Sequence, residues 1–378
     1  MLLMNLKKII SVNIYLAFLL ISCGEEYDQQ KKILENLNSS SVEKVLEFST
    51  HEDGQLFSSS LTSISTDGSE NIYFADTQSQ KVYSFTNEKN YRWSFGGEGA
   101  GSGEFEWISD IYIDQGEIYV YDSALGRVSI FDTETGRLIK EHTTELGGVM
   151  LFNQIRLAAS GKLLIPYRDN DSHKLIQVYD LGNSQSSYDI LQTENIYKTD
   201  ETHVENYIIE RDPGYPLQVG EKIVYTSKLY DGKLLVLGKT DKKEWEIKGT
   251  IAGYEAIEET VIIHESSEDE HAPSHLSGFN PEGGYFHAEF LSVSYGLFEQ
   301  EDGSVAHLSS HRTEEQQWNI VVEIFDIQGS NLKETYVLED LVLEDYQDMM
   351  FPWMDNQGHI FVSEDSETPI RKLKISEL

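Results

Sequence analysis

Cysteine is almost absent from this sequence. Cys23 is the only cysteine in a chain of 378 residues. A chain with a single cysteine forms no internal disulfide, even in an oxidising compartment. The encoded fold is therefore built without disulfide bonds, and Cys23 is left for some other role.

Basic residues are also scarce. The chain holds 29 Lys and Arg against 65 Asp and Glu, which gives a formal net charge of −36. Nucleic acids and anionic membrane surfaces attract proteins through clustered cations. The composition therefore argues against a nucleic-acid partner, and it suits an exported protein that self-repulsion keeps soluble.

Familiar catalytic motifs are missing as well. The sequence has no G-x-S-x-G nucleophile elbow, no Cys-His pairing and no H-E-x-x-H helix. The glycine-rich run 96–103 is no phosphate loop, because it contains Glu98 and is followed by a strand pattern instead of a helix. Serine, histidine and aspartate are scattered, so a triad assembled from distant segments stays open.

The apolar run near the start of the chain is too short for a membrane-spanning helix. It extends over Ile9–Ile21, whereas a spanning helix needs about 20 residues. Lys7 and Lys8 precede the run, which favours a signal peptide over residues 1–22. The run ends in Leu20-Ile21-Ser22-Cys23, which resembles the bacterial lipobox, so Cys23 is predicted to carry a lipid. The alternative is an incidental thiol at a cleavage site.

The next segment, 23–42, is predicted to be a lipidated, flexible tether. It is rich in Gln, Lys, Asn and Ser and has few apolar positions. Its cluster Gly24–Asp28 resembles the surface-export signal of some Gram-negative lipoproteins, although a plain acidic tether has the same composition. The sequence thus predicts a lipid anchor in the membrane, at the cell envelope, with the outer membrane as the favoured place; whether the protein faces the periplasm or the cell surface stays open.

Short strands fill the remainder, 43–378. In the stretch 95–132 apolar residues alternate with polar ones over three strands, and glycines mark the turns between them. Arg137 to Glu141 adds a fourth strand. Four antiparallel strands in about 45 residues are typical of one blade of a β-propeller.

The same layout recurs six times. A polar residue and a glycine precede a strand at Gly68, Gly116, Gly161, Gly232, Gly303 and Gly358. The spacings are 48, 45, 71, 71 and 55 residues, and the two long ones indicate insertions, near 188–219 and 247–295. The sequence therefore predicts an all-β, six-bladed propeller of four-stranded antiparallel blades. The last blade is short of one strand, which Val42–Phe48 is expected to supply.

Blades one and two carry a recognisable pattern. It is a glycine-rich connection, a D-x-x-G-x-I-Y-V-x-D core and an R-V-x-x-F strand, found here at 95–105, 114–122 and 127–131. This pattern resembles NHL-type repeats. With the lipobox, the chain resembles the six-bladed, NHL-like or TolB-like propeller lipoproteins of Gram-negative bacteria, and the resemblance implies the same fold and an envelope location.

The loops after each second strand are predicted to form the functional face. The charged residues that this register gathers around one mouth of the ring are Asp76, Asp122, Arg168, Asp169, Lys239, Arg312, Glu364 and Asp365. Binding residues concentrate on loops held by a rigid scaffold. The candidate ligand-binding set is Trp107, Asp122, Arg168, Arg312 and Asp365. Its guanidinium groups suit a carboxylate or a sugar acid, while Asp76 and Asp122 singly are as easily explained as caps of their own loops.

Histidines and acids crowd together within the second predicted insertion. They are His264, Glu265, Glu268, Asp269, Glu270, His271 and His275. Such side chains bind Ca²⁺ or Zn²⁺, but a solvated acidic loop has the same composition. No cofactor is expected, and Ca²⁺ is a candidate metal.

Two functions remain open from the sequence. The first is a non-catalytic, lipid-anchored propeller that binds a ligand or a protein, the partner being an envelope protein, a glycan or a peptide. The alternative is a propeller enzyme of the lactonase, lyase or hydrolase kind, with a metal in the central channel. Propeller enzymes of that kind place Asp, Asn, Glu or His on the innermost strands. The innermost segments 109–114 and 154–157 are mostly apolar or small here, which favours the binding protein.

Overall fold

The computed structural model describes most of the chain after residue 37. The described residues are 38–48, 61–144, 155–158, 161–166, 174–182, 187–192, 214–241, 245–255, 257, 260–265, 276–279, 285–313, 317–343, 350–363 and 370–375. The chain divides into two units after Ser39, and residues 40–378 form one compact unit. The first strand, β1 (Asn38–Ser40), spans the boundary. Among the described residues, no helix is long and apolar enough to cross a membrane.

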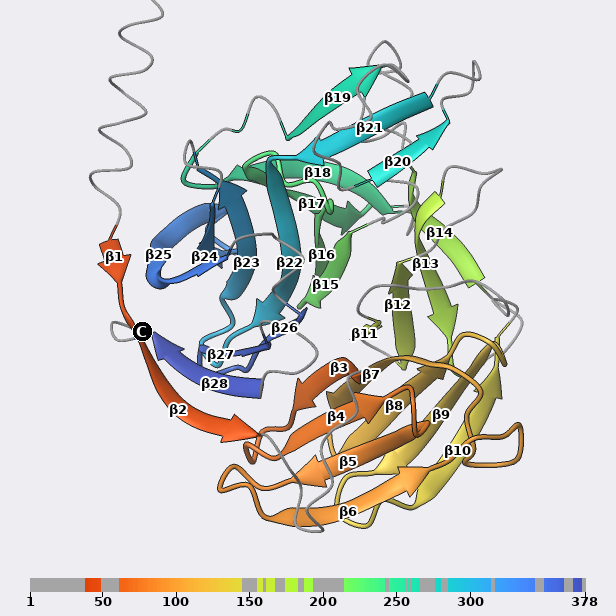
Figure 1. Ribbon diagram of the computed structural model, residues 1–378. Coiled ribbons are helices and arrows are strands. Elements are labelled where there is room, and N and C mark those ends of the chain that lie inside the picture. Colours follow the sequence, from red (N-terminus) through yellow and green to blue (C-terminus); the bar gives the residue numbers. More distant parts are fainter. Residues whose placement is uncertain are drawn as a thin grey trace, which may run out of the picture. The chain divides into compact units, whose positions relative to one another are not determined.

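Six antiparallel blades, each with four strands from residues 42–375, form the ring of the larger unit (Figure 1). Blade one is β3 (Leu61–Thr66), β4 (Ile72–Asp76), β5 (Lys81–Phe85) and β6 (Tyr91–Gly96). Blade two is β7 (Ile108–Asp114), β8 (Glu117–Asp122), β9 (Arg127–Asp132) and β10 (Leu138–Thr143). Blade three is β11 (Arg156–Ala158), β12 (Lys162–Pro166), β13 (Lys174–Asp180) and β14 (Ser187–Gln192).

The second half of the ring repeats this arrangement. Blade four is β15 (Tyr215–Val219), β16 (Lys222–Thr226), β17 (Lys233–Lys239) and β18 (Trp245–Ala252). Blade five is β22 (Ser292–Glu299), β23 (Val305–Arg312), β24 (Trp318–Asp326) and β25 (Asn331–Leu343). Blade six combines β26 (Met350–Met354), β27 (His359–Ser363) and β28 (Ile370–Ile375) with β2 (Val42–Phe48).

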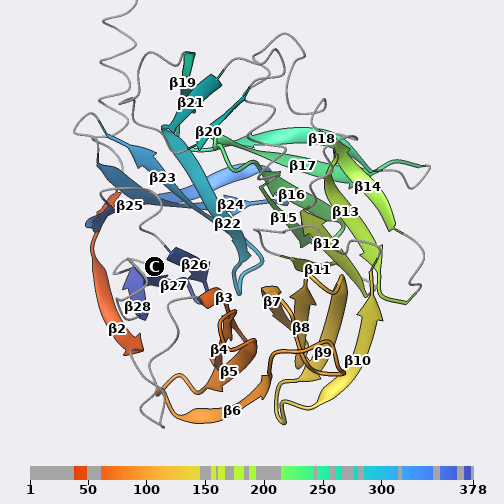
Figure 2. The same ribbon diagram turned by 45° about the vertical axis from the view of Figure 1, so that its right-hand side comes forward.

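The six blades close into a ring. Their innermost strands contact one another in the order β3, β7, β11, β15, β22, β26 and back to β3, and Figure 2 shows these strands around a common centre. The predicted fold class, an all-β six-bladed propeller with four-stranded antiparallel blades, is confirmed.

Burial along each blade follows from this packing. The middle strands β4 and β8 are buried on both faces, because each blade lies between two neighbours. The outermost strands β10 and β18 are largely exposed. The tight turn between β7 and β8 uses Gln115 (φ +47°) and Gly116 (φ +83°), the conformation that two-residue hairpin turns require.

The ring is closed by the two ends of the propeller sequence. β2 pairs antiparallel with β28, from Val42 opposite Ile375 to Phe48 opposite Ile370. The predicted pairing of Val42–Phe48 with the last blade is therefore confirmed. It covers a strand edge that would otherwise be open.

A seventh, smaller sheet lies between blades four and five in the sequence. It consists of β19 (Val261–Glu265), β20 (Leu276–Phe279) and β21 (Tyr285–Phe290), with β21 in the middle. This sheet falls within the insertion expected near 247–295. The insertion expected near 188–219 lies mostly outside the described residues.

Candidate functional site

A pocket of about 530 Å³ lies at the centre of the ring. All six innermost strands contribute to it, and those of blades one, two, five and six do so at their carboxyl ends and the turns that follow. The lining residues are Thr66, Asp67, Gly68, Tyr112, Ile113, Asp114, Gln115, Gly116, Arg156, Leu217, Leu297, Phe298, Glu299, Gln300, Trp353, Met354 and Asn356. The pocket is therefore the end of the central channel on the side of the turns that link first and second strands.

The one cation in this lining is Arg156, on β11. Its side chain is 2% exposed, and its guanidinium carbon lies 5.1 Å from the ring centre of Trp353, 5.6 Å from that of Tyr112 and 5.9 Å from that of Phe298. The aromatic rings belong to blades six, two and five, and they stabilise the charge through cation–π attraction. Arg156 Nη1 also donates a hydrogen bond to the carbonyl oxygen of Ile155, at 2.9 Å.

A buried carboxylate accompanies this cation. Asp110, on β7, is 4% exposed, and accepts hydrogen bonds from Ser63 Oγ and from the backbone N–H of Ile155, both at 2.5 Å. It thus joins blades one, two and three. Burial raises the pKa of Asp110, and the positive charge of Arg156 opposes this rise. Burial likewise lowers the pKa of Arg156, while Asp110 works in the opposite direction.

Two further carboxyl groups, those of Asp114 and Glu299, line the pocket. They end β7 and β22, which belong to the opposite blades two and five. The pKa of Asp114 is raised by burial and by the charge of Glu117. The pKa of Glu299 is raised by burial and by the charge of Asp114. The two groups therefore repel each other across the channel.

The third carboxylate of the pocket, that of Asp67, already accepts hydrogen bonds on both oxygens. Its Oδ1 accepts from the backbone N–H groups of Ser69 and Asn71, at 2.8 and 2.9 Å. Its Oδ2 accepts from Asn71 Nδ2 and from the Tyr73 hydroxyl, at 2.8 and 2.7 Å. By contrast, the carboxylate of Glu299 makes no hydrogen bond or ion pair with any described residue. Asp67 thus shapes the turn, whereas Glu299 is available to a ligand.

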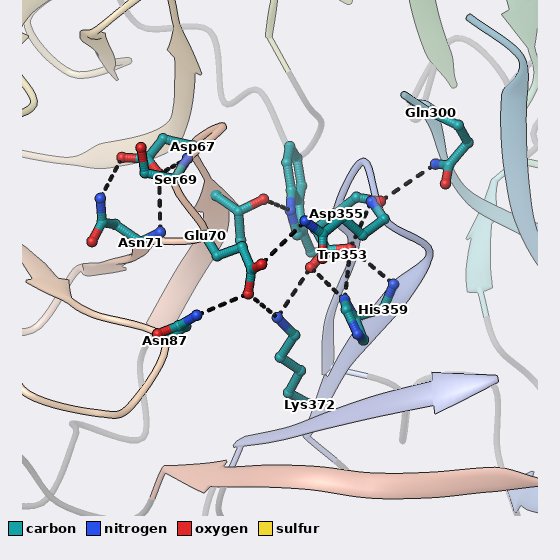
Figure 3. A network of polar contacts seen from close by, with 12 residues as sticks. Asp67, Ser69, Glu70, Asn71, Asn87, Gln300, Trp353, Asp355, His359 and Lys372 are labelled. Carbon is teal, nitrogen blue, oxygen red and sulfur yellow. Dashed lines mark hydrogen bonds and ion pairs between the residues drawn. The ribbon is translucent and has the colours of Figure 1, made fainter. Parts of the chain in front are cut away.

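A polar network fixes the pocket wall where blade six meets blade one (Figure 3). Trp353 Nε1 donates to Thr66 Oγ1 at 3.2 Å. Lys372 Nζ lies 3.3 Å from Asp355 Oδ2 and 3.8 Å from Glu70 Oε2. These contacts link β26 and β28 to the first blade, so they hold Trp353 in place.

The same network extends to neighbouring turns. Glu70 accepts from Asn87 Nδ2 at 2.9 Å and from Gln357 Nε2 at 3.1 Å. Gln300 Nε2 donates to the backbone oxygen of Asp355 at 3.4 Å. Burial alone would raise the pKa of Asp355, but its hydrogen bond with His359 and the nearby positive charges outweigh burial and lower it. Asp355 is therefore an anionic anchor for this corner of the ring.

The structure places Trp107 and Asp122 together, at the opposite end of the strands from the pocket. Asp122 is fully buried and accepts from the backbone N–H groups of Glu106, Trp107 and Leu125, at 2.8, 3.3 and 2.9 Å. It therefore caps the loops around it. The Trp107 side chain is 43% exposed and lies on the surface.

The other predicted site residues are less accessible or not described. Arg312 forms an ion pair with Glu289 of β21, and His264 Nε2 lies 3.4 Å from the same carboxylate. Arg312 thus ties the small sheet to blade five. Cys23, Arg168 and Asp365 lie outside the described residues.

The sequence predicts a site on the face that carries the loops after the second strands, whereas the pocket lies at the opposite end of the strands. Asp110 and Arg156 were visible in segments expected to be innermost strands. The apolar residues around them do not indicate that both side chains are buried, or that Arg156 lines the pocket. The one sequence signal for this site is the presence of a charged residue in a segment expected to form an innermost strand.

A serine, a histidine and a glutamate form a hydrogen-bonded chain in blade five. Ser294 Oγ lies 2.8 Å from His307 Nε2, and His307 Nδ1 lies 3.0 Å from Glu323 Oε2. The order resembles that of a hydrolytic triad. All three side chains are fully buried, so no substrate reaches the serine hydroxyl. The chain of contacts is part of the core.

In the part of the chain that the structure describes, no three His, Cys, Asp or Glu side chains are grouped closely enough to hold a metal ion. Of the histidine and acid cluster noted in the sequence, only His264 and Glu265 are described.

Comparison with known proteins identifies the family and the fold. Residues 26–214, half of the chain, match the family described as 6-bladed beta-propeller. No curated protein matches the chain.

Several solved structures share the architecture at low identity. A protein of unknown function from Bacteroides thetaiotaomicron is 12% identical, with a TM-score of 0.48 over 89% of this chain and 76% of that one. An exported protein of Bacteroides fragilis is 11% identical, with a TM-score of 0.47 over 89% and 95%. Virginiamycin B lyase from Staphylococcus aureus is 8% identical, with a TM-score of 0.43 over 88% and 99%. At these values the similarity carries no argument about activity.

Proposed function

The chain belongs to the 6-bladed beta-propeller family, and from that premise we propose that it is a lipid-anchored, non-catalytic binding protein of the cell envelope. Its ligand site is the central pocket. The anchor is a lipid on Cys23, and the favoured location is the outer membrane of a Gram-negative cell.

The observation that carries the binding role is the composition of the pocket. Its volume of about 530 Å³ falls in the range of small-molecule sites, about 300–1,000 Å³. Its lining combines apolar side chains such as Leu217, Leu297 and Met354 with a few polar groups, which is the usual composition of a ligand site. Binding is favoured over serine hydrolysis because the hydroxyl of Ser294 is buried.

The pocket is tested by narrowing its mouth. Asn356 is an exposed residue of the lining, so Asn356→Trp should block entry without disturbing the core. Ligands are first found by a thermal-shift screen of glycans, peptides, amines and organic acids. We expect Asn356→Trp to weaken binding at least about tenfold, or roughly 1.4 kcal/mol, in isothermal titration calorimetry.

The matched controls lie on the face that the sequence favoured. Trp107→Ala and Arg312→Ala should leave the affinity unchanged. Loss of binding in these two variants, together with wild-type affinity in Asn356→Trp, would show that the ligand site lies on the opposite face.

The anchor is tested at Cys23. The lipobox-like Leu20–Cys23 after an apolar run supports lipidation, and Cys23→Ala should remove the attachment point. We expect this variant to leave the membrane fraction and to take up no radiolabelled fatty acid in cells. Fatty-acid labelling and membrane retention at the wild-type level would refute the anchor.

A further inference from the structure

We infer that the pocket ligand is an organic cation, specifically an amine with an apolar or aromatic body. This inference rests on the proposed function of the pocket and adds the chemical class of the ligand.

The charges around the pocket favour a cation. Glu299 makes no hydrogen bond or ion pair with a described residue, and Asp114 accepts one hydrogen bond, from the backbone N–H of Gln115. Asp67, by contrast, accepts hydrogen bonds from its own turn and from Tyr73. The lining's positive charge, Arg156, is 2% exposed and is compensated by three aromatic rings and by Asp110. A ligand entering from the mouth therefore meets more negative than positive charge.

A bound cation would also relieve an existing repulsion. Asp114 and Glu299 stand on opposite blades, Asp114 is half-buried and Glu299 is exposed, and the charge of Asp114 acts to raise the pKa of Glu299. A positive group between them would replace their mutual repulsion by two attractions. In the empty pocket the two carboxylates repel each other, and a bound ammonium group would offset this repulsion.

The size of the pocket favours an organic cation over a metal ion. A Ca²⁺ ion needs about six to eight oxygen ligands at 2.3–2.6 Å, and no group of three candidate side chains exists among the described residues. The volume of about 530 Å³ and the apolar side chains of Leu217, Leu297 and Met354 instead fit the body of a small organic molecule.

The charge of the whole protein acts in the same direction. A net charge of −36 produces a negative potential that raises the local concentration of cations and their association rates. This part of the attraction is screened by salt, with a Debye length of about 8 Å at 0.15 M. The charge of Asp114 is screened less because this residue is half-buried, whereas Glu299 is exposed.

The experiment uses three probes of one shape and different charge: tyramine, the neutral alcohol tyrosol and 4-hydroxyphenylacetate. Each is titrated into the full-length lipoprotein in detergent, at pH 7.5 and 0.15 M salt, by isothermal titration calorimetry. We expect tyramine to bind at least about tenfold more tightly than tyrosol, and the acid not to bind measurably.

Two variants test whether the ammonium group of the ligand binds beside Glu299 and Asp114. Glu299→Gln and Asp114→Asn each keep the side-chain shape and remove repulsion, so both should remain folded. We expect each to weaken tyramine binding about tenfold and to leave tyrosol unaffected. Glu301→Gln is the matched control. It removes an exposed carboxylate from the same turn, outside the lining, and should bind tyramine as wild type does.

The outcomes separate this inference from the proposed function. Absence of tyramine binding, equal affinity for tyrosol, or equal effects of Glu301→Gln and Glu299→Gln would overturn the amine. Displacement of tyramine by stoichiometric Ca²⁺ would overturn it in favour of a metal ion. If instead Asn356→Trp left the binding of every ligand from the screen unchanged, the pocket itself would be refuted.

Discussion

Deleting residues 24–50 should unfold the propeller at temperatures where the wild type is stable. This deletion removes β2 and leaves the outer edge of β28 unpaired. Ile370, Leu373 and Ile375 of β28 are each at most 3% exposed in the intact ring, and part of their cover would be lost. We expect a loss on the order of 5 kcal/mol, comparable with the whole stability of many domains. The measurement is thermal unfolding by circular dichroism, with size-exclusion chromatography to detect edge-to-edge association.

The matched control is a deletion of residues 24–37, which leaves β2 in place. Its melting temperature should lie within about 2 °C of the wild type, because the pairing of β2 with β28 is kept. Equal melting temperatures for the two deletions would mean that β2 does not close the ring.

The fold was predictable because a local sequence pattern of turns and strands indicates each blade. A turn such as Gln115-Gly116 demands positive φ in a two-residue hairpin, and period-two apolar strands flank it. Six repetitions then leave a ring as the arrangement that buries every blade. Even the closure by Val42–Phe48 followed from counting strands, because blade six lacked one and an open edge is unfavourable.

The pocket was not predictable, because no local pattern encodes it. Arg156 is surrounded by aromatic rings from residues 112, 298 and 353, which are far apart in the chain and come from three blades. Which side chains of an innermost strand reach the channel depends on the twist of each blade and on strand register. Repeat spacing fixes neither. The sequence analysis instead favoured charged residues on loops. One of them, Asp122, accepts hydrogen bonds from the backbone of neighbouring loops and is therefore structural.

The buried chain of contacts in blade five should matter more to stability than any single residue of the pocket. Glu323 accepts from the Tyr230 hydroxyl at 2.6 Å, from the Tyr254 backbone N–H at 2.8 Å, and contacts His307 Nδ1 at 3.0 Å. Tyr230 follows β16 and Tyr254 follows β18, so the carboxylate joins blade four to blade five. One buried anion therefore satisfies donors from three separate segments.

Glu323→Gln should destabilise the protein by about 3 kcal/mol at pH 7, because it leaves buried donors without an acceptor, each at a cost of about 1–3 kcal/mol. The amide keeps the shape of the carboxylate but brings N–H donors to a site where every partner already donates. The measurement is urea unfolding followed by tryptophan fluorescence. Glu334→Gln is the matched control, because Glu334 also accepts from a tyrosine hydroxyl, that of Tyr336, but on the exposed side of β25. It should change the free energy of unfolding by about 0.5 kcal/mol or less.

The pH dependence provides a second test of Glu323. Burial alone would raise its pKa, but the hydrogen bonds from His307, Tyr230 and Tyr254 outweigh burial, so the folded-state pKa lies below the usual value. A lowered carboxyl pKa means that the stabilisation is fully present above the unfolded-state pKa, about 4.3, and is lost as the pH falls through the folded-state value. The difference in unfolding free energy between wild type and Glu323→Gln should therefore be constant from pH 6 to 8 and shrink below about pH 4. A difference that grew on acidification would show that Glu323 is held protonated and would refute the anionic link between the blades.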